Sequence, residues 1–500
     1  MTTVLLDLDC RVVGRTRELA ELRAAAQSAE RSGGACVLLS GVPGVGKSTL
    51  IRAFGDELSG RDCVFAYGRC REEASAPYAA IAEALGSVVR SMNSAGAAER
   101  DRWRADLTGG VSPPAGILEG LVPELADLPG SAARVPELDA AEARSRLHRA
   151  VIRVVAITGT YRPVVLAIDD LQWADADSLL LLSELLSVAP RNVLVLGAHR
   201  AGEFDPGSVN TAPDRLRILH LEPLAPADVE DLLAEVAGRG GELRDVASEF
   251  QHRTGGNPLH MRQLLYRAQR EGALVATGDD GRPGWDLRVL ASIEVSPTEA
   301  EFLGRCLHQL SPADRAVLGS LACIGGEFDL ADATAASAQP ADAVAQALWA
   351  SLQSRLLEAL DASGRRIANA ISRDAQYRFS HDRVAEAARI GLSDNERRKT
   401  HLHLARRLVR LGEDRLFEAA RHVGAAGSDV DDDERLEFVD VLARAARKAR
   451  AQASFPLALE HSRSALALLG GHRWAGHFEL TRRLQFDAAE AALLVGPEGL

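Results

Sequence analysis

The chain has 500 residues, of which 46% are hydrophobic and 26% charged, and its formal net charge is −12 at pH 7. This is the composition of an ordinary globular protein, and the length predicts about three domains. The net acidity argues against a dominant nucleic-acid-binding surface, and no stretch reaches the roughly 18 uncharged apolar residues of a transmembrane helix. The start, MTTVLLDLDCRVV, lacks the basic residues of a secretory signal, so we expect a soluble, cytoplasmic protein.

The first predicted strand leads into a glycine-rich loop. Residues 35–40, ACVLLS, have the apolar character of a buried strand, and GVPGVGKST follows at 41–49. The loop fits the pattern G-x-x-x-x-G-K-[ST], in which the backbone curls so that its N–H groups face phosphate oxygens. The helix that we expect over 47–58 adds the positive end of its dipole. The four defining positions hold Gly41, Gly46, Lys47 and Ser48.

The lysine of this loop stands out in the composition. Lys47 is one of only three lysines, with Lys399 and Lys448, although lysine and arginine together number 58. A chain that otherwise uses arginine has a lysine where a compact charge would reach the β- and γ-phosphates of a nucleotide. Ser48 would ligate Mg²⁺. We therefore interpret the stretch as a phosphate-binding loop (P-loop) rather than as a glycine-rich turn.

Four further apolar runs are predicted to be strands. Helical stretches separate them, and apolar strands that alternate with helices are typical of a parallel sheet covered on both faces. The sequence therefore predicts an α/β domain around the P-loop. The four runs are CVFAYGRC (63–70), PVVLAIDD (163–170), NVLVLGAHR (192–200) and LRILHLEPL (216–224).

Charged residues end two of these strands, at the sheet edge where the P-loop is also expected. We expect Asp169 to hold Mg²⁺, directly or through water, and Asp170 to orient or deprotonate an attacking water. Arg200 ends the next strand and is expected to contact the γ-phosphate. The alternatives are that the two acids cap the following helix and that Arg200 is a surface base.

From Pro226 the sequence changes to short helices. Residues 276–288, ATGDDGRPGWDLR, are rich in turn formers and predict a boundary or a hairpin. Helices after about 310, a β pair around 356–380 and a further helix indicate a winged-helix module. From about 395 the sequence is helical with closely spaced alanines, and residues 445–469 predict an antiparallel helix pair of a solenoid.

Several motifs together resemble the AAA-type ATPase domain of the STAND class of signal-transduction ATPases. They are VVGRTRELAEL (12–22), GVPGVGKST, LAIDDLQWAD, GAHR and RTGGNPLHMRQLL (253–265), and the resemblance extends from about residue 11 onward. It implies ATP or ADP as the nucleotide and Mg²⁺ as the cofactor. It also implies that a G-R-x-R-E box lies near the adenine and ribose, and that a G-N-P turn lies in a lid over the nucleotide. The implied nucleotide-binding residues are Val13, Gly14, Arg15, Gly41, Gly44, Val45, Gly46, Lys47, Ser48, Thr49, Asn257, Pro258 and His381.

His381 comes from RFSHDRV, which resembles the His–Asp motif in the winged-helix domain of the same class. The resemblance implies that His381 touches the β-phosphate of bound ADP and thereby latches the winged helix onto the nucleotide domain. The alternative is a histidine packed in the winged-helix core, with Asp382 capping the next helix.

On this basis the chain divides into four parts. We expect a P-loop AAA-type nucleotide-binding domain at 1–224, a helical lid at 225–290, a winged-helix-like domain at 291–394 and incomplete TPR-like helical repeats at 395–500. Stretches such as HRWAGHFELTRRLQFDAAEAALLVG resemble the ATPase-plus-repeat segment of large bacterial regulators. We therefore expect residues 1–500 to be the input and switch portion of a longer protein.

The predicted function is an ATP-binding regulatory switch that hydrolyses ATP slowly and acts in signal transduction. Asp170, Lys47 and Arg200 are the predicted catalytic residues, with Ser48 and Asp169 as metal ligands. Slow turnover is expected because many AAA motors have a glutamate where this chain has the shorter Asp170. The alternative is an ATP-dependent transcriptional regulator whose DNA-binding module is absent from this chain.

We expect a protein partner or output domain to bind at the helical repeats, and we expect ATP-dependent self-association. We expect no membrane partner and no direct nucleic-acid binding by this portion.

Overall fold

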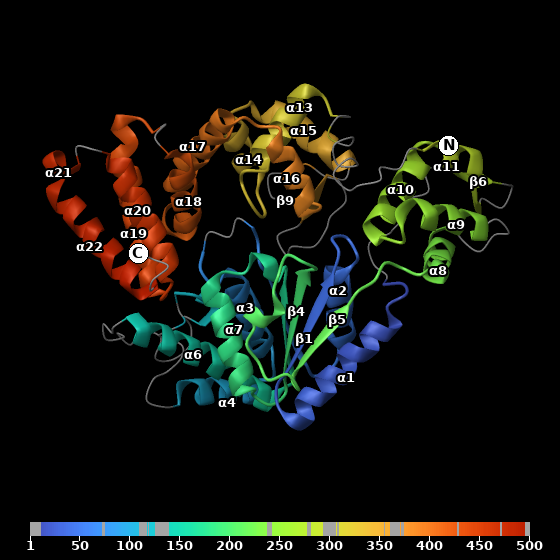
Figure 1. Cartoon of the computed structure of the whole chain (residues 1–500), viewed down its shortest axis with the longest axis horizontal. Helices are drawn as coiled ribbons and strands as arrows, with labels where there is room; N and C mark the ends of the chain where they lie inside the picture. The colour runs from blue at the N-terminus through green and yellow to red at the C-terminus, as the bar shows by residue number, and fades with distance from the viewer. Residues whose placement is uncertain are drawn as a thin grey trace. The chain divides into compact units, whose positions relative to one another are not determined.

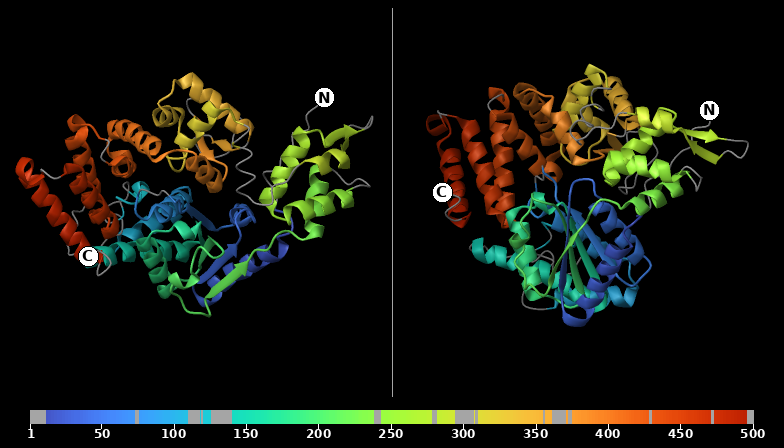
Figure 2. Two further views of the ribbon diagram at one scale, coloured as in Figure 1. Left: turned by 45° about the horizontal axis from the view of Figure 1, so that its top comes forward. Right: turned by 45° about the vertical axis from the view of Figure 1, so that its right-hand side comes forward.

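The computed structural model forms two compact units, which Figures 1 and 2 show in ribbon form. The first unit combines Met1–Cys70, Ala80–Ala133 and Ala150–Glu299, and the second combines Arg71–Ala79, Arg134–Arg149 and Ala300–Leu500. None of the helices in the described ranges has both the length and the apolar character that crossing a lipid bilayer requires. The described residues are 12–72, 76–109, 118, 120–125, 140–237, 243–277, 282–293, 307, 310–354, 356–360, 371, 375–427, 430–470 and 473–495.

A five-stranded parallel sheet forms the centre of the first unit, as the sequence predicted. Its strands are β1 (Ala35–Gly41), β2 (Val64–Arg69), β3 (Val164–Asp169), β4 (Val193–Arg200) and β5 (Leu216–His220), in the order β2-β3-β4-β1-β5. The register aligns Gly41 with Arg200 and Arg69 with Asp169. The carboxyl ends of four strands therefore meet at one edge.

Helices bury both faces of this sheet, which explains why its inner strands are apolar throughout. On one face, Leu22 of α1 (Thr16–Ser32) and Phe54 of α2 (Lys47–Leu58) pack against Leu39 and neighbouring strand residues. Alternate residues such as Leu38 and Leu166 point to the opposite face and are equally buried. Figure 1 shows the strands between α1 and α7. The remaining helices of this part are α3 (Ala79–Asn93), α4 (Ala97–Thr108), α6 (Ala140–Tyr161) and α7 (Ala176–Val188).

A small helical subdomain follows β5 in the same unit. It contains α8 (Pro226–Ala237), α9 (Leu243–Thr254), α10 (Pro258–Arg270) and α11 (Leu287–Ser292). Its core includes Phe250, Leu264 and Leu290. Strands β6 (Leu274–Thr277) and β7 (Arg282–Trp285) pair antiparallel, so the turn-rich stretch at 276–288 belongs to a hairpin.

Among the described residues from Ser311 to Ile390, three helices, a hairpin and a further helix follow one another, which is the element order expected of a winged-helix module. The elements are α13 (Pro312–Leu321), α14 (Leu330–Ser337), α15 (Ala341–Gln353), β8 (Leu357–Leu360), β9 (Gln376–Phe379) and α16 (Asp382–Ile390). Strands β8 and β9 are antiparallel, and Phe328 makes a further antiparallel bridge to Tyr377. Both aromatic side chains lie in the core of this part.

From Asp394 onward the described residues are mostly helical. The helices are α17 (Asp394–Leu411), α18 (Leu416–Ala426), α19 (Asp432–Ala451), α20 (Phe455–Leu469), α21 (Arg473–Gly476) and α22 (Phe478–Val495). Small residues such as Ala445, Ala449 and Ala465 lie in their shared core, so the helices approach closely. The helix pair predicted over 445–469 corresponds to the end of α19 and to α20.

Candidate nucleotide-binding site

The P-loop connects β1 to α2 and depends on two glycines with left-handed backbone. Gly44 has φ +75° and Gly46, the N-cap of α2, has φ +103°. Such angles are strained for residues with a Cβ. A Cβ on Gly44 would also lie 2.6 Å from Cβ of Leu259. The loop therefore keeps its shape only with glycine at these positions, and the N-terminus of α2 opens onto it.

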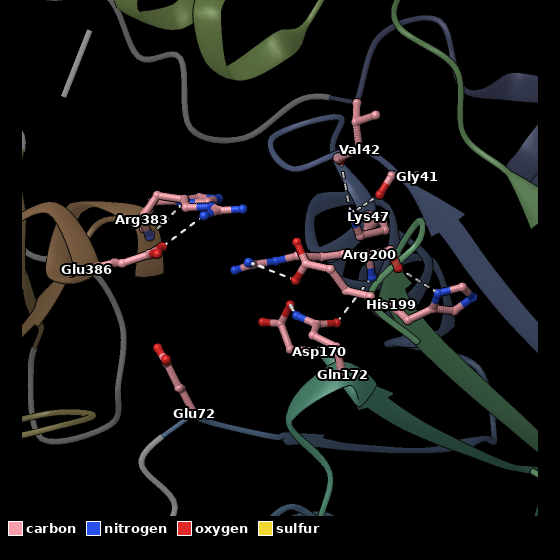
Figure 3. A network of polar contacts seen from close by, with 12 residues as sticks. Gly41, Val42, Lys47, Glu72, Asp170, Gln172, His199, Arg200, Arg383 and Glu386 are labelled. Carbon is pink, nitrogen blue, oxygen red and sulfur yellow. Dashed lines mark hydrogen bonds and ion pairs between the residues drawn. The ribbon is translucent and has the colours of Figure 1, made fainter. Parts of the chain in front are cut away.

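Lys47 lies folded against its own loop. Its Nζ donates to the carbonyl oxygens of Gly41 at 2.8 Å and Val42 at 3.1 Å, as the dashed lines in Figure 3 show. Burial lowers the pKa of Lys47, and the negative charges of Asp170 and Asp169 act in the opposite direction. The ammonium group is thus held at the loop where phosphate oxygens would bind.

Asp169 ends β3 and is completely buried. Its Oδ1 accepts from the backbone N–H of Asp170 at 3.0 Å, and its Oδ2 accepts from the hydroxyl of Tyr67 at 3.0 Å. The hydroxyl of Ser48 also hydrogen-bonds to this carboxylate. Burial, followed by the charge of Asp170, raises the pKa of Asp169. A nearby cation would offset that unfavourable charge.

These donors fit Mg²⁺. A carboxylate and a hydroxyl are hard oxygen ligands, and Mg²⁺ usually takes one or two protein ligands together with substrate phosphates. Within the described ranges, no group of three or more His, Cys, Asp or Glu side chains is placed to hold a metal ion. The assignment of Ser48 and Asp169 as Mg²⁺ ligands remains a prediction, in which phosphate oxygens of a bound nucleotide would complete the coordination.

Asp170 is held on both sides of its carboxylate. Its Oδ2 accepts from Nε of Arg69 at 2.8 Å, and its Oδ1 accepts from Nε2 of Gln172 at 3.0 Å. Burial would raise the pKa of Asp170, but the charge of Arg69 and these two hydrogen bonds outweigh it, so the pKa lies below its usual value. Asp170 does not cap the next helix, because Asp175 caps α7 by accepting from the backbone N–H of Ser178 at 2.8 Å.

Arg200 ends β4 and is only 5% exposed, so it is not a surface base. Its Nη1 lies 3.2 Å from Oε2 of Glu203, and its guanidinium lies over the ring of Trp173, 5.7 Å from the centroid. Its backbone N–H donates to Oε1 of Gln172 at 3.1 Å. Figure 3 shows Arg200 between the P-loop and Asp170.

The box around Arg15 packs onto the P-loop. Nη2 of Arg15 donates to the carbonyl oxygens of Val45 at 3.0 Å and Glu222 at 2.7 Å. Gly14 has φ +72°, and a Cβ there would lie 2.4 Å from Cγ of Asp228. Val13 is half-buried beside them. The structure therefore brings this box, the P-loop and the start of α8 together.

The G-N-P turn also contacts the P-loop. Nδ2 of Asn257 donates to the carbonyl oxygen of Pro43 at 3.0 Å. Asn257 is the N-cap of α10 and accepts from the backbone N–H of Leu259 at 3.0 Å, with Pro258 at the first helical position. The same N–H lies 3.3 Å from the carbonyl oxygen of Gly44. One side chain thus ties the helical subdomain to the loop.

Two predicted residues stand apart from these contacts. Thr49 lies in the first turn of α2 and is exposed. His381 lies in the second unit, where it is the N-cap of α16 and its Nδ1 accepts from the backbone N–H of Arg383 at 3.2 Å. The capping residue is thus His381 rather than Asp382. Its contact with a nucleotide remains a prediction.

Sequence reasoning missed Arg69, Tyr67 and Gln172, which hold the two acids. A signal was present for Arg69, because it ends a predicted strand whose carboxyl end falls at the same edge as Asp169. Tyr67 lies two residues earlier on that strand, so its side chain points to the same face as that of Arg69. No signal identified Gln172, since its role depends on a turn that the pattern does not specify.

Comparison with known proteins agrees with this geometry. Residues 11–196 match the AAA ATPase domain family. The hybrid signal transduction histidine kinase G of Dictyostelium discoideum is 28% identical over 175 residues, which are 34% of this chain and 5% of that protein. The chain therefore spans a small fraction of the length of this relative.

The fold of the whole chain also has a solved counterpart. It is similar to a Signal Transduction ATPase with Numerous Domains (STAND) protein with a tetratricopeptide repeat sensor from Pyrococcus horikoshii. The TM-score is 0.52 at 14% sequence identity, and the match covers 99% of this chain and 59% of that one. Residues 11–196 thus match the family of AAA ATPase domains, and the chain shares the fold of this solved structure.

Proposed function

We propose that this chain is an ATP-binding regulatory switch that hydrolyses ATP slowly. The observation that carries the proposal is the arrangement at one sheet edge. There the P-loop with Lys47, the Ser48–Asp169 pair, Asp170 and Arg200 all belong to the first unit and end or follow adjacent strands. An AAA ATPase domain supports nucleotide hydrolysis in general. We propose in addition that this hydrolysis is slow and regulatory.

In this proposal the phosphates of ATP bind to the N–H groups of the P-loop and to Lys47. Mg²⁺, held by Ser48 and Asp169, would neutralise charge on the β- and γ-phosphates. Asp170 orients a water molecule toward the γ-phosphorus and takes its proton as the new P–O bond forms. The bond between the γ-phosphorus and the β,γ-bridging oxygen breaks, and ADP leaves with the electron pair. Arg200 donates to the γ-phosphate, where negative charge must be stabilised.

The hydrogen bonds of Asp170 support slow turnover. A carboxylate whose pKa lies below its usual value is a weak proton acceptor, and both of its oxygens already accept hydrogen bonds. Asp170 must exchange one of these partners before it binds the attacking water. ATP would therefore persist in the site, which a switch requires and a motor does not.

For partners, we propose a protein or output domain that binds the helices α17–α22, together with ATP-dependent self-association. Support comes from the fold shared with a STAND protein that has a tetratricopeptide repeat sensor. The sequence of α15, ADAVAQALWASLQ, contains neither lysine nor arginine. A helix without basic residues is poorly suited to a DNA groove, so α15, in the part with the winged-helix element order, does not favour nucleic-acid binding.

The test is calorimetric titration with Mg·ATP. We expect Lys47→Ala to weaken binding by more than about tenfold, or about 1.4 kcal/mol, because no other lysine occurs in the first unit. Lys399→Ala is the matched control: it removes one exposed lysine from α17 and should leave the affinity unchanged. Wild-type affinity in Lys47→Ala would overturn the assignment of the loop.

A further inference from the structure

Gln172 makes two hydrogen bonds to different parts of the site. It lies in the short 3₁₀ turn η2 (Leu171–Trp173), directly after Asp170. Its Nε2 donates to Oδ1 of Asp170 at 3.0 Å, and its Oε1 accepts from the backbone N–H of Arg200 at 3.1 Å. Figure 3 shows the amide between these two residues. One side chain therefore connects the ends of β3 and β4.

The orientation of this amide follows from its partners. A backbone N–H can only donate, so the oxygen of the amide must face Arg200. The amide nitrogen then faces Asp170, whose ionised carboxylate can only accept. Neither contact survives if the amide is turned over. The two hydrogen bonds hence depend on each other and fix the side chain in one position.

The backbone at Asp170 makes this support necessary. Asp170 has φ +57° and ψ +47°, a left-handed conformation that is uncommon for residues other than glycine. Such a residue keeps its conformation when its surroundings hold it. Gln172, two residues later, holds one carboxylate oxygen, and Arg69 of β2 holds the other.

The neighbouring residue acts on the same arginine. Trp173 places its ring 5.7 Å from the guanidinium of Arg200, which also pairs with Glu203. Gln172 thus contacts the backbone of Arg200, and Trp173 contacts its side chain. A movement of Arg200 would therefore change its contacts with two residues of the turn η2.

We propose that Gln172 is a positioning residue that couples Arg200 to Asp170, so that engagement of Arg200 by the γ-phosphate aligns Asp170 for water attack. The proposal rests on the proposed function, because it assigns Arg200 to the γ-phosphate and Asp170 to the water. It places the effect of Gln172 on the hydrolytic step and not on nucleotide affinity. ADP, which lacks the γ-phosphate, would not engage the coupling.

Two substitutions separate positioning from a merely structural role. Gln172→Glu keeps an oxygen that accepts from Arg200 but faces Asp170 with a like charge in place of a donor. Gln172→Leu removes both hydrogen bonds. If Gln172 only held the end of β4, Gln172→Glu would leave the hydrolysis rate unchanged and Gln172→Leu would lower it. If it positions Asp170, both lower the rate, and Glu does so although its contact with β4 remains.

The experiment measures phosphate release and the affinities for Mg·ATP and Mg·ADP on the full chain. We expect Gln172→Glu to lower kcat by roughly tenfold to a hundredfold while both affinities stay within about threefold of wild type. Gln346→Glu, on the exposed side of α15, introduces the same charge change away from the site and should match wild type.

The outcomes separate the two proposals. A wild-type chain that neither binds nor hydrolyses Mg·ATP contradicts the proposed function itself. A wild-type chain that hydrolyses ATP, with Gln172→Glu equal to it, overturns only the coupling. If Gln172→Glu lowers the affinity for Mg·ADP by as large a factor as it lowers kcat, Gln172 has a structural role and the coupling is overturned. If Gln172→Leu fails to fold, as judged by its melting curve, Gln172→Glu decides the question alone.

Discussion

At the residue scale, Asp169 and Asp170 are neighbours in sequence whose environments move their pKa values in opposite directions. Burial and the charge of Asp170 raise the pKa of Asp169. Arg69 and Gln172 overcome the burial of Asp170 and lower its pKa. Asp169 is costly to ionise, so a bound cation would stabilise its charged form. Asp170 is already stabilised as an anion by its neighbours and does not require a cation. The two acids are thus suited to different tasks, metal binding and water orientation.

This difference predicts distinct phenotypes for the two amide substitutions. Asp170→Asn keeps the size of the side chain but removes the proton acceptor, so ATP should bind with near wild-type affinity and persist. Asp169→Asn should weaken binding in the presence of Mg²⁺ and have little effect when EDTA removes the metal. Calorimetry with and without Mg²⁺, together with phosphate release, measures both effects.

The pair of variants serves as its own control, since each removes one negative charge from the same sheet edge. Hydrolysis at the wild-type rate by Asp170→Asn would show that another residue orients the water. Equal loss of affinity with and without Mg²⁺ in Asp169→Asn would contradict its assignment as a metal ligand.

At the element scale, the carboxyl ends of parallel strands gather the site, and this is why much of it could be predicted from the sequence. Apolar runs identified all five strands, and the P-loop pattern located the start of α2 at Lys47. The fifth strand ends at His220 rather than 224, because the chain turns away from the sheet edge where the carbonyl of Glu222 binds Arg15. An apolar run does not show where such an edge strand stops.

The contacts of Asp170 could not be predicted in the same way. Its pairing with Arg69 depends on β2 and β3 being neighbours, and strand order is not visible in the spacing of apolar residues. Its contact with Gln172 depends on the left-handed backbone at Asp170. Both are consequences of topology and of one unusual dihedral angle. Sequence pattern therefore indicated the candidate reacting groups, and the structure shows the residues that contact them.

Two helices of the second unit meet at a buried histidine, His422, and a half-buried one, His401. Nδ1 of His401 in α17 and Nδ1 of His422 in α18 are 2.8 Å apart, and Nη2 of Arg421 lies 3.0 Å from Nε2 of His422. At this distance one Nδ1 carries a proton and donates it to the other, and His422 also hydrogen-bonds to the backbone of Ile324. Both rings are then neutral.

This pair predicts an acid-sensitive junction between α17 and α18. Burial lowers the pKa of His401 to about 4 and that of His422 well below its usual value, and the nearby charges of Arg421, Arg389 and Arg397 act in the same direction. The unfolded chain binds protons below about pH 6.5 and the folded chain does not, so stability falls from pH 6.5 toward pH 4. The loss is on the order of 1 kcal/mol per histidine at pH 5.5.

Hydrogen exchange measures this effect locally, which suits a chain with two units. After correction for the intrinsic rate, amides of α17 and α18 should exchange faster at pH 5.5 than at pH 7.5. His401→Gln keeps an amide that can hydrogen-bond to His422 but does not titrate, so it should reduce the pH dependence. His477→Asn replaces an exposed histidine and serves as the control. Equal pH dependence in His401→Gln and wild type would contradict the assignment.

At the scale of the whole molecule, a nucleotide switch needs a state that ADP and ATP stabilise differently. The helical subdomain of the first unit contacts the P-loop through Asn257. The resemblance to STAND proteins adds a second candidate, His381 of the second unit. The match covers 59% of the solved STAND counterpart, so this chain spans about three fifths of its length.

His381 has a local role that any test must separate from a nucleotide contact. It caps α16 by accepting from the backbone N–H of Arg383. Removing an N-cap costs about 1 kcal/mol of helix stability, and asparagine is among the best replacements. An asparagine at this position therefore preserves the cap while it removes the imidazole. The comparison of two substitutions distinguishes the two roles.

We predict that both His381→Ala and His381→Asn weaken ADP binding more than ATP binding, because the proposed contact is with the β-phosphate in the ADP-bound closed form. A differential of about 1–3 kcal/mol is typical of such coupling. Affinities for both nucleotides, together with light scattering in ATP and in ADP, measure the shift toward an open or self-associated form. If His381→Asn matches wild type while His381→Ala only lowers the melting temperature, the residue is a helix cap and the latch lies elsewhere. If both variants weaken ADP selectively, the cap cannot explain the loss, because asparagine retains it, and the imidazole itself must favour the ADP-bound state.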